Sequence, residues 1–415
     1  MFRNYTEDGT PLLTDSTSKI CGHFLLDNTS TTVANTLRRC ILMETRSVGF
    51  RADLTNDTDP GIRIIKNTGA VFNEMLAHRL TLIPLGVRNL AEFDPTRYEF
   101  ALKAKNETSE TVHVTADQFI VREKDENGLF VPLDRLVTAA MFPEDPITRA
   151  TALVTTLKAR WNPDLPADEI DLVAYPVIGR GRDFMGFCPV AQASFENTRD
   201  DDPVRQEAFF HEWLASFKKV TEPSTVDPAT LDGYRREWLT MAVQRCFRVD
   251  EKGQPNSFTF TVESVGIRPV KEIVAEAIKA AVDLVAPYVD AEMPGVSFLP
   301  LDSRMSGIRA VFEEQEHTLG NLLEAMIHEL YLDTEDPAAP ISYAAYKVPH
   351  PLQKKMVITL GKHAVSEAID ADIPEGVARQ VIAAAAQKAR ALFEELGRAW
   401  STIDAQGPTA ATLEG

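Results

Sequence analysis

The sequence predicts an α+β fold in which two similar lobes form an intramolecular pseudo-dimer, with a β-rich domain inserted in the first lobe. One observation is a repeat, because the amphipathic segments TVANTLRRCILMET and TLGNLLEAMIHEL, at 32–45 and 318–330, begin alike. Strand-like segments flank both copies, and each half of the chain closes with a strand leading into a long amphipathic helix. Only the first half contains a long β-rich interruption, which we interpret as the inserted domain.

The composition is that of a globular protein and excludes a strongly basic nucleic-acid binder. A chain of 415 residues is long enough for two or three domains, and 44% of its residues are hydrophobic and 25% are charged. The net charge of −18 offers nucleic acid no attraction to the molecule as a whole. We therefore expect DNA or RNA to be contacted only locally or through a partner.

The cysteines and the start of the chain indicate a soluble protein of a reducing, intracellular compartment. No cysteine pair has the C-x2-C spacing of zinc or redox sites, so we interpret all four as small buried hydrophobes. They are Cys21, Cys40, Cys188 and Cys246. The N-terminus has no apolar signal region and no run of about 18 apolar residues occurs, so we expect no membrane contact. The histidines lack a compact ligand spacing, and we predict neither a metal nor a cofactor.

The first amphipathic helix has one buried face and one arginine-bearing face. The buried face follows the i, i+3, i+4, i+7 spacing and consists of Val33, Ala34, Leu37, Cys40 and Ile41. Thr31 or Thr32 is the expected N-cap. Arg38 and Arg39 lie off the apolar stripe, so we expect them to point outward, where a partner binds them. Arginines that simply meet solvent are the alternative.

The first lobe, over 1–52 and 186–286, is completed by strands and a second helix. The expected strands are 20–27, 186–195 and 257–265. A helix follows Pro269, which suits a first helical turn. Its apolar stripe consists of Val270, Ile273, Val274, Ala277, Ile278, Ala281, Val282 and Val285.

Two stretches interrupt this first lobe. The range 53–185 alternates strand-like pieces such as 98–105 and 111–115 with turn-forming clusters, and it includes a helix-like segment at 72–80. We predict a β-rich insert domain there. The range 196–257 is acidic and irregular, and we expect a lineage-specific contact or a disordered excursion.

The second lobe follows a linker predicted at 287–306 from its prolines and glycines. The lobe itself spans 307–400, and a frayed tail is expected at 401–415. Its expected elements are a strand at 308–314, the helix at 318–330, strands at 342–348 and 355–360, and a final helix within 374–400.

The apolar stripes predict that the two lobes pack against each other. One small sheet with two helices cannot bury all of its own stripes, whereas two lobes packed helix against helix can do so. A chance match between the two helix starts is the alternative. The residues expected between the lobes are Val33, Leu37, Ile41, Ile273, Ala277, Leu319, Leu322, Leu323, Met326, Leu330, Leu392 and Leu396.

These motifs resemble those of two RNA polymerase subunits. The first lobe is similar to the third-largest subunit of eukaryotic RNA polymerase II, a relative of the archaeal D-type polypeptide and of the bacterial alpha N-terminal domain. The residues that carry this similarity are NTLRRCILMET at 35–45, FNEMLAHRLTLIPL at 72–85 and FTFTVESVGIRPVKEIV at 258–274. The second lobe resembles the eleventh subunit, whose archaeal relative is the L-type polypeptide, through FEEQEHTLGNLL at 312–323 and AAYKVPHPLQKKMVITL at 344–360.

The resemblance implies two alpha-subunit-like dimerisation lobes that form a non-catalytic assembly platform for a DNA-dependent RNA polymerase. The implied partners are the largest and second-largest subunits and a tenth-subunit-like small subunit, with DNA and RNA reached only through the complex. An arginine fork binds carboxylates at such interfaces. The residues expected to face the large subunits are Asn35, Arg38, Arg39, Arg79, Arg180 and Arg182.

The fusion of both subunit types in one chain resembles the arrangement in nucleocytoplasmic large DNA viruses. A viral polymerase would lie in the virion and the host cytoplasm, with the nucleus as the alternative. The zinc-loop cysteines found in many third subunits have no counterpart in the insert. No metal is therefore expected there.

Other functions remain as alternatives. A free-standing scaffold or regulatory protein that binds host polymerase would share the same two-lobe fold, and stoichiometry within purified polymerase would separate the two. GRGRD at 179–183 resembles a phosphate-contacting loop, although an exposed connector or a contact with the second-largest subunit suits the acidic chain better. No convergent acid–base or metal set supports an independent enzyme.

Overall fold

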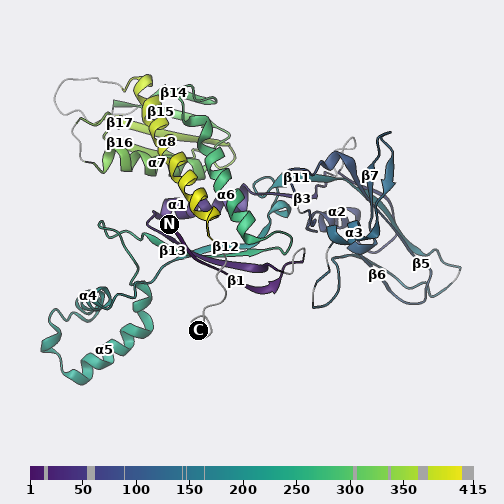
Figure 1. The fold of residues 1–415 in the computed structure, drawn as a ribbon, viewed down its shortest axis with the longest axis horizontal. Coiled ribbons are helices and arrows are strands. Elements are labelled where there is room, and N and C mark those ends of the chain that lie inside the picture. The colour runs from purple at the N-terminus through teal and green to yellow at the C-terminus, as the bar shows by residue number, and fades with distance from the viewer. Residues whose placement is uncertain are drawn as a thin grey trace.

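The structure is a computed structural model in which two α+β lobes, an insert domain and a helical excursion are distinguished (Figure 1). It describes residues 1–13, 17–53, 61–87, 89–142, 144–145, 147–162, 164–301, 306–334, 338–362 and 373–403. Most of the predicted tail, 404–415, lies outside the described residues.

The first lobe contains an antiparallel sheet in the order β1-β2-β13-β12 with two helices on one face (Figure 1). Its strands are β1 (Phe2–Pro11), β2 (Lys19–Asp27), β12 (Val190–Asn197) and β13 (Ser257–Ser264). Its helices are α1 (Thr31–Met43) and α6 (Val270–Val285). The predicted strands of this lobe correspond to β2, β12 and β13, whereas the edge strand β1 was not expected from the sequence.

Helix α1 begins one residue earlier than predicted. The side chain of Ser30, rather than Thr31 or Thr32, accepts the hydrogen bond from the main-chain N–H of Val33. The predicted apolar stripe of α1 is buried throughout. Pro269 is likewise the N-cap of α6 rather than a residue of its first turn.

The insert contains a five-stranded antiparallel sheet in the order β4-β10-β5-β7-β8 and has its own apolar core. The sheet strands are β4 (Ile62–Asn67), β5 (Tyr98–Asn106), β7 (Ile120–Lys124), β8 (Phe130–Pro132) and β10 (Asp168–Ala174). A ribbon of β6 (Val112–Thr115) and β9 (Leu153–Leu157) and the helices α2 (Asn73–Thr81) and α3 (Arg135–Met141) complete it. A second ribbon, β3 (Arg46–Phe50) with β11 (Pro176–Arg180), leads from the first lobe into the insert.

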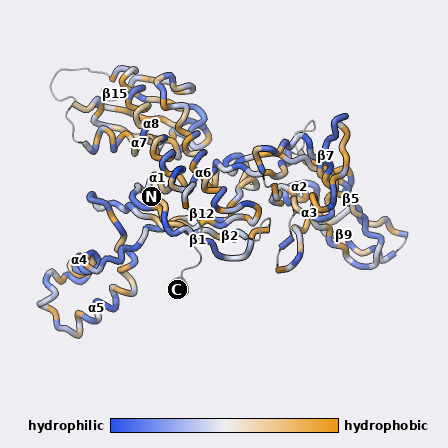
Figure 2. Tube along the Cα trace, viewed as in Figure 1, coloured by the Kyte–Doolittle hydropathy of each residue, from blue (hydrophilic) through white to orange (hydrophobic). Residues whose placement is uncertain are grey.

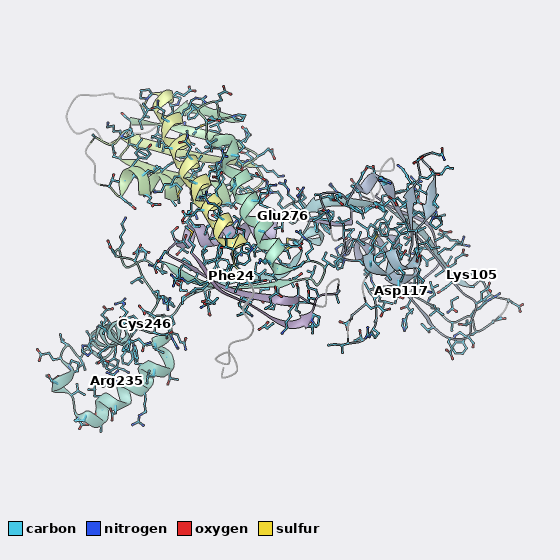
Figure 3. The ribbon with its side chains drawn as sticks, in the orientation of Figure 1. Phe24, Lys105, Asp117, Arg235, Cys246 and Glu276 are labelled. Carbon is cyan, nitrogen blue, oxygen red and sulfur yellow. The ribbon has the colours of Figure 1, made fainter. Side chains whose placement is uncertain are left out.

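The range expected to be irregular or disordered, 196–257, contains two helices that project from the first lobe (Figure 1). They are α4 (Pro203–Trp213), continued by one π-turn at Leu214–Lys218, and α5 (Pro228–Met241). Phe210, Trp213 and Trp238 form the centre of a small separate core. Arg235, labelled in Figure 3, holds the helices together, because its Nη2 lies 2.6 Å from a carboxylate oxygen of Glu207.

The second lobe repeats the plan of the first, with an antiparallel sheet in the order β14-β15-β17-β16 and two helices. The elements are β14 (Val296–Pro300), β15 (Ser306–Glu313), α7 (His317–Ile327) with a π-turn at His328–Leu332, β16 (Tyr343–Lys347), β17 (Lys355–Lys362) and α8 (Glu375–Ser401). The expected linker over 287–306 is therefore only partly a connector. Its residues 296–300 pair with β15, because an edge strand tolerates prolines.

The two lobes share one apolar core. Residues from α1, α6, β2 and β13 and residues from α7, α8, β15 and β17 belong to the same continuous cluster. The insert and the α4–α5 excursion keep separate clusters. Hydrophobic and hydrophilic residues are interleaved along the chain (Figure 2), and no helix of the described residues is long and apolar enough to cross a membrane.

Candidate functional site

The candidate site is the seam between the lobes, where α6 packs on α8 and α1 packs on α7. The helices approach closely because small residues lie between them. A Cβ added to Gly397 of α8 would lie 3.6 Å from Cγ2 of Ile278 on α6, in ordinary van der Waals contact. Ala277 and Ala281 of α6 and Ala385 and Ala389 of α8 are fully buried in the shared core.

The structure places all twelve residues expected between the lobes in this shared core or directly against it. Those buried in the core are Val33, Leu37, Ile41, Ile273, Ala277, Leu319, Leu322, Leu323, Met326 and Leu396. Leu330 and Leu392 are partly buried and pack on it. The periodicity correctly predicts that these helical faces are buried, and the part of each residue in holding the lobes together stays a prediction.

Trp400, near the end of α8, packs the second lobe against strands β1 and β2 of the first. Only 1% of its surface is exposed, and its ring lies 4.9 Å from the rings of Phe2 and Phe24 and 5.3 Å from that of Tyr5, edge to face in each case. Its indole Nε1–H donates to the main-chain carbonyl of Lys271, 2.9 Å away. The polar atom of this buried indole is therefore satisfied across the seam.

Polar contacts reinforce the seam at its edges. Arg39 donates from Nε to Oγ1 of Thr318 at 2.6 Å, and this bond joins the later part of α1 to the start of α7. Gln387 of α8 donates to the carbonyl of Val289, 2.8 Å away. Arg379 donates to the carbonyl of Ala291 at 2.8 Å. These carbonyls lie just after α6, so α8 also fixes the path of the chain between the lobes.

The α1 residues predicted to face a large subunit have partners within the chain. Arg38 is half-buried and donates from Nε to Oδ1 of Asn35 at 3.0 Å, three residues earlier. Burial, with the neighbouring Arg39, lowers the pKa of Arg38. Arg39 points toward the second lobe, because its Nε contacts Thr318. Arg39 was expected to point outward to a partner, but its side chain also contacts the second lobe across the seam.

Two further predicted arginines bind the carboxylate at the end of α1. Arg182 lies 2.7 Å and Arg180 3.5 Å from the Glu44 carboxylate, which is 9% exposed. The loop between them lies against the helix end, since the main-chain N–H of Arg182 donates to the carbonyl of Met43 at 3.1 Å. This carbonyl end of α1 favours nearby positive charge. The GRGRD segment thus connects the insert to the first lobe.

Arg79 lies apart from the other predicted residues, on α2 of the insert. Its Nη2 donates to the carbonyl of Leu153 at 3.0 Å, which ties α2 to β9. The six residues expected at a large-subunit interface therefore occupy α1, the 180–182 loop and the insert. Their contact with another subunit stays a prediction.

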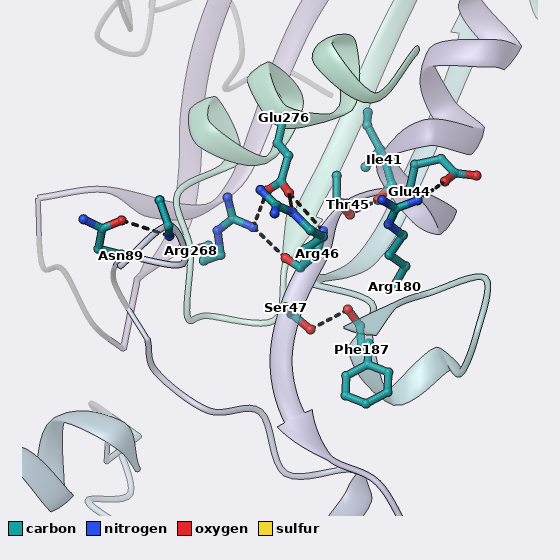
Figure 4. A network of polar contacts seen from close by, with 11 residues as sticks. Ile41, Glu44, Thr45, Arg46, Ser47, Asn89, Arg180, Phe187, Arg268 and Glu276 are labelled. Atoms are coloured by element: carbon teal, nitrogen blue, oxygen red, sulfur yellow. Dashed lines mark hydrogen bonds and ion pairs between the residues drawn. The ribbon is translucent and has the colours of Figure 1, made fainter. Parts of the chain in front are cut away.

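An ion triad next to this loop, with one buried, one partly buried and one exposed member, was not expected from the sequence (Figure 4). The two oxygens of Glu276 on α6 bind Arg46 Nε at 3.0 Å and Arg268 Nη1 at 2.8 Å. Arg268 also donates to the carbonyl of Arg46 at 2.9 Å. Burial on its own would raise the pKa of Glu276, but the two guanidinium groups outweigh it and hold that pKa below its ordinary value.

The triad fixes the point where the insert leaves the first lobe. Arg46 is the first residue of β3, Arg268 lies two residues before α6, and Glu276 lies within α6. Glu276 lies beside the apolar stripe of α6, three residues after the buried Ile273, and its residue type alone did not distinguish it from a solvated acid. The buried apolar faces of the seam hold the two lobes together. The paired charges of the triad fix the direction in which the insert leaves the first lobe.

Comparison with protein families identifies both lobes. The model of the RNA polymerase Rpb3/Rpb11 dimerisation domain matches residues 23–285, which span the first lobe and its insert. A second model with the same description matches residues 308–399, which form the second lobe. The first match alone covers more than half of the chain.

Curated relatives lead to the same family. The chain is 28% identical over 296 residues to the human DNA-directed RNA polymerases I and III subunit RPAC1, covering 62% of this chain and 77% of that protein. It is 25% identical over 288 residues to the Saccharomyces cerevisiae protein of that name, covering 62% and 80%. It is 25% identical over 297 residues to the DNA-directed RNA polymerase II subunit RPB3 of Schizosaccharomyces pombe, covering 67% and 86%. With two matched dimerisation domains that share one core, this chain belongs to the RNA polymerase Rpb3/Rpb11 dimerisation-domain family.

Proposed function

We propose that this chain is a non-catalytic assembly subunit of a DNA-directed RNA polymerase and that one polypeptide supplies both halves of the platform. The observation that carries the proposal is the continuous core that buries α1 and α6 together with α7 and α8. Each half matches the same dimerisation-domain family, and relatives of the first half are polymerase subunits. In this proposal the first lobe takes the Rpb3 part and the second lobe the Rpb11 part.

The proposed partners are the largest and second-largest polymerase subunits and a tenth-subunit-like small subunit. The faces left for them are the Arg38 surface of α1, the 180–182 loop and the insert. Arg38 supports the α1 face, because Asn35 orients its guanidinium while the side chain stays half-exposed. A preoriented guanidinium loses little conformational entropy when it binds a carboxylate bidentately. DNA and RNA would be reached only through the assembled enzyme.

Charge reversal at Arg38 tests this surface. Arg38→Glu is preferable to a double change that includes Arg39, because Arg39 also bonds to Thr318 across the seam. The tagged full-length variant is expected to stay folded and monodisperse but to lose the second-largest subunit on purification from the native source. The matched control is Arg236→Glu on the exposed side of α5. Undiminished recovery of the second-largest subunit with Arg38→Glu would exclude the α1 face.

We also propose that the single chain arose by gene fusion in a large DNA virus and that it works inside the host cell, in the cytoplasm or the nucleus. Two family matches in one chain support the fusion. Mass spectrometry of purified virions, together with the genes flanking the coding sequence, tests the origin. A cellular gene neighbourhood would contradict the viral part and leave the platform proposal intact.

A further inference from the structure

A cluster of three potential metal ligands lies on the face of the first-lobe sheet opposite its helices. Asp8 of β1 stands directly across from Cys21 of β2, and His23 is two residues further along β2 on the same face. The Oδ2 atom of Asp8 lies 3.2 Å from Nε2 of His23, and that nitrogen lies 3.5 Å from Sγ of Cys21. One ligand atom from each residue lies within 4.8 Å of the other two.

These separations fit a tetrahedral zinc ion. Zinc binds sulfur at about 2.3 Å and nitrogen or oxygen at about 2.0–2.2 Å, so the edges of a tetrahedral site are about 3.6 Å from sulfur to nitrogen and about 3.4 Å from nitrogen to oxygen. The observed separations are 3.5 and 3.2 Å. Small side-chain adjustments would therefore bring the three atoms into coordination. A water molecule would complete the fourth position.

A hydroxyl group of the neighbouring strand β13 orients the histidine ring. Thr261 of β13 stands directly across from His23, and its Oγ1 lies 3.1 Å from Nδ1 of the ring. In the tautomer in which Nδ1–H donates to this hydroxyl, Nε2 is unprotonated and faces Asp8 and Cys21. The carboxylate of Glu263, across from Cys21 on β13, adds negative charge at this face. Cys21 and His23 are partly exposed and Asp8 is exposed, so an ion reaches them from solvent.

We propose that Asp8, Cys21 and His23 form a site for zinc or a cation of similar softness. The mixture of one thiolate, one imidazole and one carboxylate suits zinc better than magnesium or calcium, which prefer oxygen ligands. The ion would cross-link the edge strand β1 to β2. Tyr5, in the same β1 strand, packs against Trp400 of the second lobe. The proposed cation site is independent of the polymerase assignment.

The test uses the tag-free, reduced full-length chain, stripped with a chelator and dialysed against zinc sulfate or cobalt chloride. One equivalent of zinc is expected to remain bound, with a sulfur-to-cobalt charge-transfer band in the cobalt form and a higher melting temperature than the stripped chain. Cys21→Ser should abolish the charge-transfer band and the zinc-dependent rise in melting temperature. Thr261→Val should weaken zinc binding by about ten- to a hundredfold.

The chain offers a matched control histidine. His113 of β6 also stands across from a threonine, Thr156 of β9, with Nδ1 lying 3.3 Å from its Oγ1. It belongs to no ligand cluster found among the described residues. His113→Gln should therefore leave zinc binding unchanged, whereas His23→Gln should reduce it. Absence of bound zinc in the wild-type chain, or equal binding by Cys21→Ser, would overturn the proposal.

Discussion

The indole Nε1–H of Trp400 donates a hydrogen bond to the main-chain carbonyl of Lys271, 2.9 Å away, and so ties the last helix of the second lobe to α6 of the first. The ring is also enclosed by aromatic side chains of β1 and β2. The final turn of one lobe therefore completes the core of the other. Stability measurements on this residue report directly on the seam.

Trp400→Ala is expected to lower the free energy of unfolding by about 3–5 kcal/mol, because it leaves a cavity in the shared core. Urea unfolding followed by circular dichroism measures the change. Trp161→Ala is the matched control, since Trp161 is 84% exposed, and its effect should stay within about 0.5 kcal/mol. Equal effects of the two substitutions would mean that the lobes do not share a core at this position.

The bond between Arg39 and Thr318 is expected to couple the two repeated helices energetically. A double-mutant cycle of Arg39→Ala with Thr318→Val should give a coupling energy of about 1 kcal/mol, since both side chains are only half-buried. The same cycle with Arg38→Ala in place of Arg39→Ala should give about zero. Coupling confined to Arg38 would contradict the placement of the two arginines.

The triad predicts a pH dependence of stability. Glu276 has a folded-state pKa below its ordinary value near 4.5, so its stabilisation is present above that value and is lost as the pH falls through the lower folded-state pKa. Glu276→Gln should lower the free energy of unfolding by about 3 kcal/mol at neutral pH, because Arg268 stays buried without its partner.

The difference between wild type and Glu276→Gln should therefore shrink when urea unfolding is repeated at successively lower pH below 4.5. Glu251→Gln, at an exposed position, is the control and should follow the wild-type curve at every pH. A wild-type advantage over Glu276→Gln that stays constant down to acid would contradict the account of the triad.

Alanine substitutions at two helical glycines should change the stability of the protein in opposite directions. A Cβ at Gly320 of α7 would lie 2.4 Å from the ring of Tyr346, so Gly320→Ala should destabilise the protein by about 1–3 kcal/mol. A Cβ at Gly233 of α5 meets nothing within 4 Å, so Gly233→Ala should stabilise α5 by about 0.5–1 kcal/mol. Thermal unfolding of both variants checks the pair, and a stabilising Gly320→Ala would contradict the close packing of α7 on β16.

The helices of the seam were predictable from the sequence because their apolar residues recur at helical spacing on one face. Helices α4 and α5 were missed because they are polar and bury few residues, although each carries a start signal. Asp202 and Asp227 each cap a helix, and each is followed by a proline at the first helical position. Strand β1 was missed because only Tyr5 of its ten residues is buried. An exposed edge strand has little apolar alternation to recognise.

The apolar part of the candidate site was accessible to sequence reasoning, whereas its polar part was not. Burial of Leu37 or Ile273 follows from local periodicity, but the pairing of Glu276 with Arg46 joins residues that are far apart in the chain. The same holds for Glu44 with Arg182, and for Asp8 with His23. Such pairs depend on how the strands are ordered. Cys21 shows the consequence, since it is half-exposed rather than buried as expected.

The most direct test of the central claim is the stoichiometry of polymerase purified from the native source through a tag on this chain, measured by native mass spectrometry. If one polypeptide supplies both halves of the platform, each complex will contain one copy of the chain with the largest and second-largest subunits and no separate Rpb11-type chain. Two copies in each complex, a separate Rpb11-type chain, or recovery without the large subunits would contradict the claim.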